Sequence, residues 1–85
     1  MNNQTKFAII GAGTMGEAII AGLLRQKLTS PENIYASEPR QERCEELQIK
    51  YGINTSTQNV QVLANADVVL LSVKPQILDK ILKEL

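Results

Sequence analysis

The stretch from Phe7 to Leu24, FAIIGAGTMGEAIIAGLL, constrains the fold of this chain more than any other feature of its sequence. Three glycines, Gly11, Gly13 and Gly16, follow a short continuous apolar run and open a segment with the apolar spacing of a helix. In such a unit the first glycine lets the chain reverse, the second leaves room for a pyrophosphate against bare backbone, and the third lets the helix approach the sheet. The motif therefore predicts a dinucleotide whose phosphates face the N–H groups and the positive dipole end of the first helical turn.

The glycine turn admits two other interpretations. A glycine-rich bend between a strand and a helix can bind nothing at all, and methyltransferases that bind S-adenosylmethionine also carry a glycine turn after their first strand. The methyltransferase turn does not usually keep the full spacing of three glycines. The strand before the turn, the helix after it and the βαβ spacing that follows favour a dinucleotide over both alternatives.

Apolar runs alternate with helical periodicity along the whole chain. The expected strands are residues 7–10, 34–37, 53–55 and 67–73, and the expected helices are residues 14–26, 39–51 and 60–65, with a last helix that opens at Pro75. The first helix is expected to bury Met15, Ala18, Ile19, Gly22 and Leu23. The second is expected to bury Cys44, Leu47 and Tyr51 and to end at Gly52.

Strands that alternate with helices predict right-handed crossovers and a parallel sheet with the spatial strand order 3, 2, 1, 4. The expected fold class is α/β, a Rossmann-type doubly wound parallel sheet of which residues 1–85 form the N-terminal portion, βαβαβαβα. A sheet of this type normally continues past its fourth strand, whose outer edge would otherwise stay unpaired. We therefore expect the chain to be the N-terminal piece of a longer protein.

Charge and composition exclude several classes of function. The 85 residues contain 9 basic and 9 acidic side chains, so nothing attracts the chain to nucleic acid or to an acidic membrane surface. The sequence has no histidine and a single cysteine, which excludes an internal disulfide, Ser/His/Asp triads, Cys/His dyads and histidine-containing metal sites. We expect no metal, no nucleic-acid or membrane partner, a cytoplasmic location, and Cys44 as an apolar filler instead of a nucleophile.

Ser37, Glu38 and Arg40 follow the second expected strand, where the adenosine ribose of a dinucleotide is bound. Glu38 comes about 20 residues after the glycines, the spacing at which an acid accepts hydrogen bonds from the ribose. Ser37 can donate to a ribose hydroxyl or to a 2′-phosphate, and Arg40 can offset the repulsion between a carboxylate and that phosphate. The choice between NADH and NADPH stays open, as does the alternative that Glu38 and Arg40 form a solvated pair at a helix start.

The segments IIGAGTMGEAIIAGL, YASEP and VVLLSVKPQ together resemble pyrroline-5-carboxylate reductase, the enzyme of the last step of proline biosynthesis. The resemblance covers almost the whole chain, and SVKPQ is its more specific part because many dehydrogenases share the glycine motif. Independently of the family, ligands of open α/β sheets bind beyond the carboxyl ends of the strands, where the first and fourth expected strands meet. The glycine turn and the SVKP loop are therefore expected to reach one ligand.

The resemblance implies that the glycine turn lies under the pyrophosphate, that Asn59 approaches the nucleotide, and that the loop from Ser72 runs toward the nicotinamide. The alternatives are that Lys74 is a surface lysine and that Pro75 only initiates a helix. The predicted cofactor-binding residues are Ile10, Gly11, Ala12, Gly13, Thr14, Met15, Gly16, Ser37, Glu38, Arg40, Asn59, Ser72, Val73, Lys74 and Pro75.

The resemblance further implies that NADPH or NADH reduces the C=N bond of 1-pyrroline-5-carboxylate to give L-proline. In the family, a C-terminal helical domain supplies the substrate pocket, the proton-supplying hydroxyl and the dimer interface, so no residue of this chain is expected to be catalytic. The full-length protein is expected to be a homo-oligomer. The alternatives are another dehydrogenase with the same N-terminal fold, which the VKP segment disfavours, and a non-catalytic nucleotide-binding paralogue.

Overall fold

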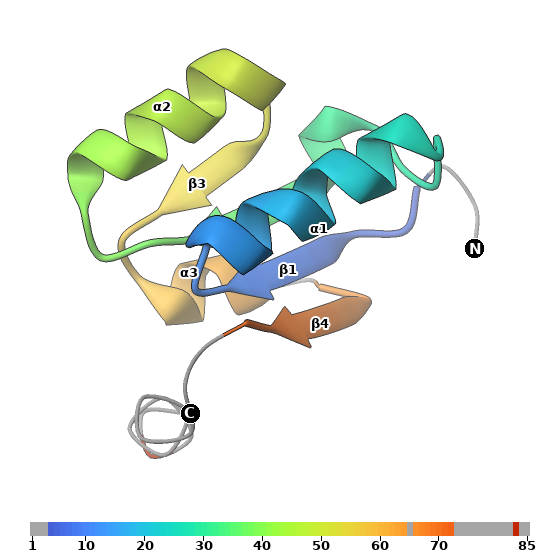
Figure 1. Ribbon diagram of the computed structural model, residues 1–85. Coiled ribbons are helices and arrows are strands. Elements are labelled where there is room, and N and C mark those ends of the chain that lie inside the picture. Colours follow the sequence, from blue (N-terminus) through green and yellow to red (C-terminus); the bar gives the residue numbers. More distant parts are fainter. Residues whose placement is uncertain (1–3, 65, 73–82, 84–85) are drawn as a thin grey trace.

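The computed structural model describes residues 4–64, 66–72 and 83 of the chain. Its elements follow in the order β1 (Phe7–Ile10), α1 (Thr14–Arg25), a short 3₁₀ helix (Pro31–Asn33), β2 (Ile34–Ser37), α2 (Gln41–Tyr51), β3 (Asn54–Ser56), α3 (Asn59–Leu63) and β4 (Val68–Leu71). The four strands form one parallel sheet in the order β3-β2-β1-β4 (Figure 1). The predicted α/β class and strand order are confirmed.

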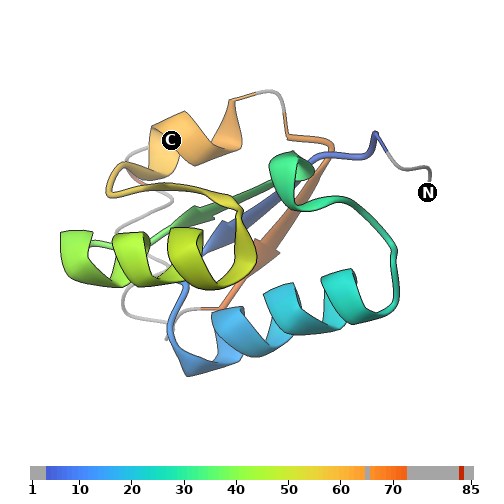
Figure 2. The ribbon, with the colours of Figure 1, turned by 90° about the horizontal axis from the view of Figure 1, so that it is seen from above.

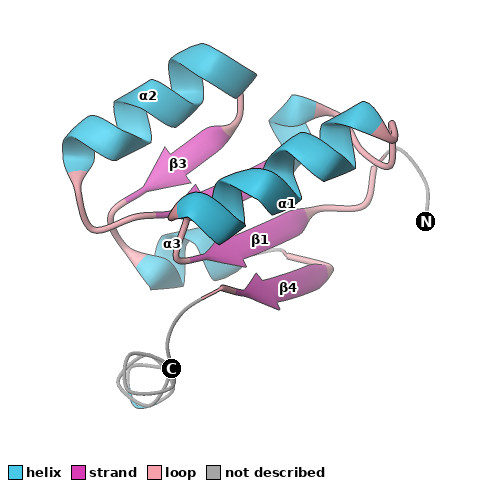
Figure 3. Ribbon diagram, viewed as in Figure 1, coloured by secondary structure: helices cyan, strands magenta, loops and turns pink. Residues whose placement is uncertain are grey.

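Helices cover the sheet on both faces, with α1 and α2 on one side and α3 on the other (Figures 2 and 3). Successive side chains of a strand point to opposite faces, so each inner strand supplies both layers. Phe7 and Ile9 of β1 pack with the α1 and α2 side, whereas Ile10 packs with Val62 of α3. This two-sided burial explains why β1 is a continuous apolar run and not an alternating one.

The carboxyl ends of the strands lie at one edge of the sheet. Ile10 is in register with Ser37 of β2 and with Leu71 of β4, and Ser37 is in register with Ser56 of β3. The residues that directly follow these strands therefore emerge side by side. The ends of β2 and β4 border the glycine turn that links β1 to α1.

The rotation of α1 about its axis differs from the prediction. Its buried residues are Gly16, Ile20 and Leu23, whereas Met15 is 68% exposed. Ala18 is also exposed, so the predicted apolar face was wrong in part. A Cβ on Gly16 would lie 2.8 Å from the Gly11 carbonyl oxygen, so only the missing side chain lets this position face the sheet. The close approach of Gly16 to Gly11 therefore sets the rotation of α1, and this rotation directs Met15 outward.

The second helix begins two residues later than predicted, at Gln41 instead of Pro39. The Glu38 carboxylate accepts the backbone N–H of Arg40 at 3.2 Å, and Arg40 keeps an extended conformation as the N-cap residue. This local turn occupies the position where the proline predicted a first helical turn. The helix ends as predicted at Gly52, whose φ of +71° lies in the left-handed region.

The remaining boundaries shift by one or two residues. The strand predicted at residues 53–55 is β3 (Asn54–Ser56), the helix predicted at residues 60–65 is α3 (Asn59–Leu63), and α1 ends at Arg25. The fourth strand, predicted at residues 67–73, is β4 (Val68–Leu71). Val73 and the helix predicted from Pro75 lie outside the described residues. Among the described helices, none combines the length and apolar character that a membrane crossing needs.

Replacing Gly16 by alanine is expected to destabilise the fold by about 1 to 3 kcal/mol, the usual cost of overpacking. The new Cβ would meet the Gly11 carbonyl oxygen at 2.8 Å and the Ser72 Oγ at 3.1 Å, and the backbone atom cannot rotate away. Urea unfolding followed by circular dichroism measures the change.

Gly22→Ala is the matched control on the same helix. Its Cβ would meet only the Arg25 Nη2 atom, 4.0 Å away, so alanine should stabilise the helix by about 0.5 to 1 kcal/mol. Equal stability changes in the two variants would contradict the close approach of α1 to the sheet.

Candidate functional site

The glycine turn leaves β1 through Gly11, whose φ of +84° is favourable only for glycine. The Gly13 N–H donates to the Gly11 carbonyl oxygen at 2.9 Å, which closes the turn directly before α1. The neighbouring strand holds the turn in place, because Ala12 N donates to the Ser37 carbonyl oxygen at 2.9 Å. The Gly11 N–H in turn donates to the Ser37 Oγ at 3.2 Å. The turn is therefore positioned by β2.

Gly13 is the N-cap residue of α1 and offers no side-chain cap to the first helical turn. The first N–H groups of a helix have no partner within the helix, and they carry its positive dipole end. A Cβ at Gly13 would meet no atom within 4 Å, and Gly13 and Thr14 line a hollow, so open space adjoins the start of α1. Thr14 and Met15, which follow Gly13, are also exposed. This geometry fits an anionic group such as a pyrophosphate.

The carboxyl end of β4 joins the same turn through Ser72. Its N–H donates to the Ile10 carbonyl oxygen at 3.0 Å, and its hydroxyl lies 2.5 Å from the Gly11 carbonyl oxygen. Two segments that are 61 residues apart in the sequence thus meet at the point where the strand order reverses. Val73, Lys74 and Pro75 lie outside the described residues, so their predicted contacts stay predictions.

The tip of β2 carries a buried polar pair. Ser37 and Glu38 are 2% and 4% exposed, and the Glu38 N–H donates to the Ser56 carbonyl oxygen of β3 at 3.0 Å. Arg40 Nε donates to the Glu38 Oε1 atom at 2.7 Å, while the Arg40 side chain stays 69% exposed. The hydrogen bond that Arg40 donates to Glu38 raises the pKa of Arg40 above its ordinary value, and the negative charge of Glu38 adds to this effect. Glu38 and Arg40 therefore do form a pair at the helix start, of which only Arg40 is exposed to solvent.

A hollow of about 420 Å³ lies between the N-terminal ends of α1 and α2. Its lining combines the backbone of the glycine turn with charged side chains of α2, and consists of Gly13, Thr14, Arg40, Glu42, Arg43 and Glu46. The hollow adjoins both the uncapped start of α1 and the tip of β2. A ligand that reached from the phosphate position to the end of β2 would pass over it.

The sequence reasoning missed three residues of this lining, namely Glu42, Arg43 and Glu46. Their spacing offered a signal, because Arg40, Arg43 and Glu46 recur every third residue directly after a strand tip and so share one side of a helix. Asn59, by contrast, begins α3 beyond β3, and no described hydrogen bond joins it to the glycine turn.

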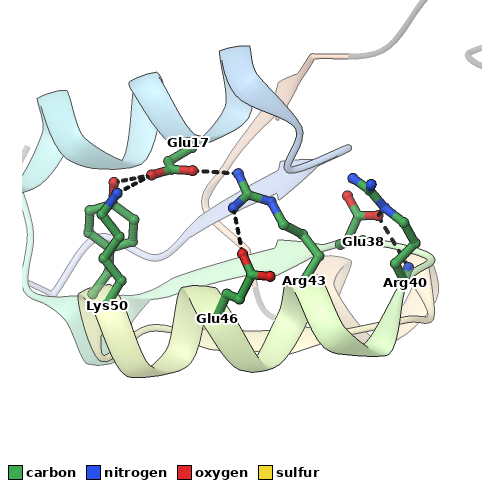
Figure 4. A network of polar contacts seen from close by, with 7 residues as sticks. Glu17, Glu38, Arg40, Arg43, Glu46 and Lys50 are labelled. Atoms are coloured by element: carbon green, nitrogen blue, oxygen red, sulfur yellow. Dashed lines mark hydrogen bonds and ion pairs between the residues drawn. The ribbon is translucent and has the colours of Figure 1, made fainter.

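Glu17 of α1 ties that helix to α2 (Figure 4). Its Oε1 atom accepts a hydrogen bond from Arg43, whose other terminal nitrogen lies 3.3 Å from Glu46. Its Oε2 atom accepts from Lys50 Nζ at 2.7 Å and from the Tyr51 hydroxyl at 2.6 Å. These donors, Lys50 first, then Tyr51 and Arg43, lower the pKa of Glu17 from 4.5 to about 2. The Glu17 network therefore holds one wall of the hollow.

Comparison with known proteins gives a consistent result. The family model described as NADP oxidoreductase, coenzyme F420-dependent, matches residues 6–85. The chain is 41% identical to a pyrroline-5-carboxylate reductase of Methanosarcina acetivorans over 100% of its own length and 31% of that protein. It is 42% identical to the protein of the same name from Vibrio alginolyticus, over 94% of this chain and 29% of that one. The chain spans less than a third of the length of these curated relatives.

Solved structures agree with this likeness. A pyrroline-5-carboxylate reductase from Coxiella burnetii matches with a TM-score of 0.88 and 30% identity, over 96% of this chain and 30% of that one. A Plasmodium falciparum pyrroline carboxylate reductase solved with NADP bound matches with a TM-score of 0.78 over 96% of this chain and 29% of that one. At 22% identity, the second match shows the fold alone. The resemblance read from the sequence is confirmed.

The Glu17→Gln variant is expected to be less stable than the native chain by about 1 to 2 kcal/mol at pH 7. This is less than the full effect of the pKa shift, because Lys50 is exposed and solvent weakens its interaction with Glu17. The folded-state pKa of about 2 lies below the ordinary 4.5, so the carboxylate stabilises the fold above pH 4.5. That contribution is lost as the pH falls from 4.5 to 2. Urea unfolding at several pH values should show the two proteins converge over this range.

Glu45→Gln is the control, because Glu45 is exposed on the same helix as Arg43 and Lys50. This variant should differ from the native chain by less than about 0.5 kcal/mol at every pH. A stability gap for Glu17→Gln that did not change between pH 7 and pH 2 would contradict the role given to its charge.

Proposed function

Because this chain belongs to the family of NADP oxidoreductases described as coenzyme F420-dependent, we propose that it is the dinucleotide-binding N-terminal part of a pyrroline-5-carboxylate reductase. One observation carries the proposal. The uncapped start of α1 faces open space at Gly13, and Ser72 brings the end of β4 to the same turn. The names of the relatives supply the substrate class.

The residues present fit a dinucleotide. The backbone from Ile10 to Gly16 would lie under the pyrophosphate, where the N–H groups of the first helical turn donate without a basic side chain. Gly13 is proposed to lack a side chain for this contact, since a Cβ there would project into the open space at the start of α1. Gly11 and Gly16 have structural roles, because Gly11 forms the turn and Gly16 lets α1 pack against the sheet. The backbone of the turn thus binds and orients the cofactor.

The proposed reaction is the reduction of 1-pyrroline-5-carboxylate to L-proline. When bound, a reduced nicotinamide supplies the hydride for the C=N carbon, and a proton at the ring nitrogen completes the product. The chain's own contribution is to hold the nucleotide at the carboxyl edge of the sheet, between β1 and β4, with Asn59 and the loop of Val73, Lys74 and Pro75 as further proposed contacts. We assign no catalytic residue to this chain.

The rest of the proposal concerns the whole protein. The chain is proposed to be followed by a helical domain that supplies the substrate pocket, the proton donor and a homo-oligomer interface. Its partners are proposed to be small molecules, and its location the cytoplasm. A formal net charge of zero is in line with the proposal that it binds neither nucleic acid nor a membrane. The chain matches only 31% of the length of its Methanosarcina relative, which supports the proposal that it belongs to a longer protein.

The activity is tested by following NADPH and NADH oxidation with 1-pyrroline-5-carboxylate as substrate, using the full-length protein that carries this chain. Turnover that depends on this substrate is expected, with L-proline as product. Nucleotide binding without turnover would favour a non-catalytic paralogue, and turnover with a hydroxy acid or another substrate would favour a different dehydrogenase.

Gly13→Val is expected to weaken nucleotide binding at least about tenfold while the stability of the fold changes by less than about 1 kcal/mol. The added side chain enters space that no protein atom occupies but that the pyrophosphate would need. Isothermal titration with NADPH and NADH gives the affinity, and urea unfolding gives the stability. An unchanged affinity in a folded variant would show that the phosphates bind elsewhere.

A further inference from the structure

The side chain of Ser72, the residue that follows β4, is turned toward the protein's own backbone. Its Oγ atom lies 2.5 Å from the Gly11 carbonyl oxygen and 3.2 Å from the Ile10 carbonyl oxygen. Gly16 of α1 closes another side, because a Cβ there would lie 3.1 Å from the same Oγ atom. The Ser72 hydroxyl is therefore held between the end of β1 and the start of α1.

This position determines what the Ser72 hydroxyl can offer to a ligand. A serine hydroxyl has one proton to donate, and its oxygen otherwise carries only lone pairs. The shorter of the two contacts directs the proton to the Gly11 carbonyl oxygen. A phosphate is itself an acceptor and gains nothing from the remaining lone pairs. The Ser72 hydroxyl is thus placed to hold the glycine turn and not to bind a phosphate.

The peptide unit between Gly11 and Ala12 is the part of the turn that Ser72 contacts. The carbonyl oxygen of this unit accepts from Ser72 and, at 2.9 Å, from the Gly13 N–H. Its N–H group donates to the Ser37 carbonyl oxygen at 2.9 Å. Glycine adopts both signs of φ readily, so the φ of +84° at Gly11 is not fixed by the residue itself. Contacts with β2 and β4 fix the plane of this peptide instead.

The orientation of the Gly11–Ala12 peptide determines which polar groups the turn presents. With its carbonyl bound to Ser72 and Gly13, the N–H groups at the start of α1 are left to face an anion. A rotation of this peptide would release a carbonyl oxygen beside the same site, and its partial negative charge would repel a phosphate. Holding the peptide in place before the ligand arrives also lowers the entropy cost of binding.

We propose that Ser72 is a positioning residue of the nucleotide site: its hydroxyl holds the Gly11–Ala12 peptide in the orientation that binds the pyrophosphate and does not itself contact the nucleotide. The inference rests on the proposed function, since it takes the glycine turn as the pyrophosphate site. It gives the Ser72 side chain a role different from the direct cofactor contact that the family resemblance implies.

The test is isothermal titration of the full-length protein that carries this chain. The ligands are NADPH, NADH and their nicotinamide-free counterparts, 2′-phospho-ADP-ribose and ADP-ribose, which keep the pyrophosphate. Ser72→Ala should weaken the binding of every one of them that the native protein binds by about three- to tenfold, the value of one hydrogen bond converted to affinity. Ser72→Thr keeps a hydroxyl, and its affinities should stay within about twofold of the native values.

Thr29→Val is the matched control. The Thr29 hydroxyl also donates to a backbone carbonyl, that of Thr5 at 3.1 Å, but Thr5 precedes β1 at the opposite edge of the sheet. Valine has nearly the shape of threonine and lacks the hydroxyl. This variant should lower the midpoint of urea unfolding while all affinities stay within about twofold of the native values. Circular dichroism of each variant establishes that it is folded before its affinities are compared.

The outcomes separate this inference from the proposed function. Binding of no nucleotide by the folded native protein would overturn both together. With native binding intact, unchanged affinities in Ser72→Ala would overturn only the inference, because the hydroxyl would then have no effect on the site. A loss confined to NADPH and NADH would overturn it as well, since Ser72 would then act at the nicotinamide. Equal losses in Thr29→Val, or a folded Ser72→Thr variant as weak as Ser72→Ala, would also contradict it.

Discussion

The close approach of α1 to the sheet at Gly16 is the contact on which the rest of the structure depends. Because this residue has no Cβ, the helix backbone lies against the Gly11 carbonyl oxygen and the Ser72 hydroxyl at the junction of β1 and β4. The contact sets the rotation of α1, so Ile20 and Leu23 face the core and Met15 faces outward. It also places the free N–H groups of the first helical turn at the carboxyl edge of the sheet.

Hydrogen bonds from the two neighbouring strands hold that edge together. Ser37 accepts N–H groups of the glycine turn through both its carbonyl and its hydroxyl oxygen, and Ser72 donates back to the end of β1. Three parallel strands therefore position one short loop. A loop that is already ordered loses little conformational entropy when it binds, so the energy of its contacts with a phosphate is retained as affinity.

Charged side chains divide into two groups around the hollow between α1 and α2. In the Glu17 network, donors surround the carboxylate, and Arg43 is paired both with Glu17 of α1 and with Glu46 of its own helix. At the tip of β2, Glu38 accepts hydrogen bonds from the backbone N–H and the Nε atom of Arg40. Two arginines three residues apart at the start of α2 thus differ in their surroundings, since both terminal nitrogens of Arg43 are paired with carboxylates whereas the Arg40 side chain stays exposed. The difference comes from their partners and not from their spacing.

The strands at residues 7–10 and 34–37, the strand order and the helix end at Gly52 could be predicted from sequence alone, because continuous apolar runs and a left-handed glycine are local signals. It also predicted the glycine turn and its meeting with the end of β4. The rotation of α1, the burial of Glu38 and the pairing of Glu17 with Arg43 are visible only in the three-dimensional structure. These depend on which surfaces pack most closely and on contacts between residues far apart in the chain, and a one-dimensional pattern carries neither.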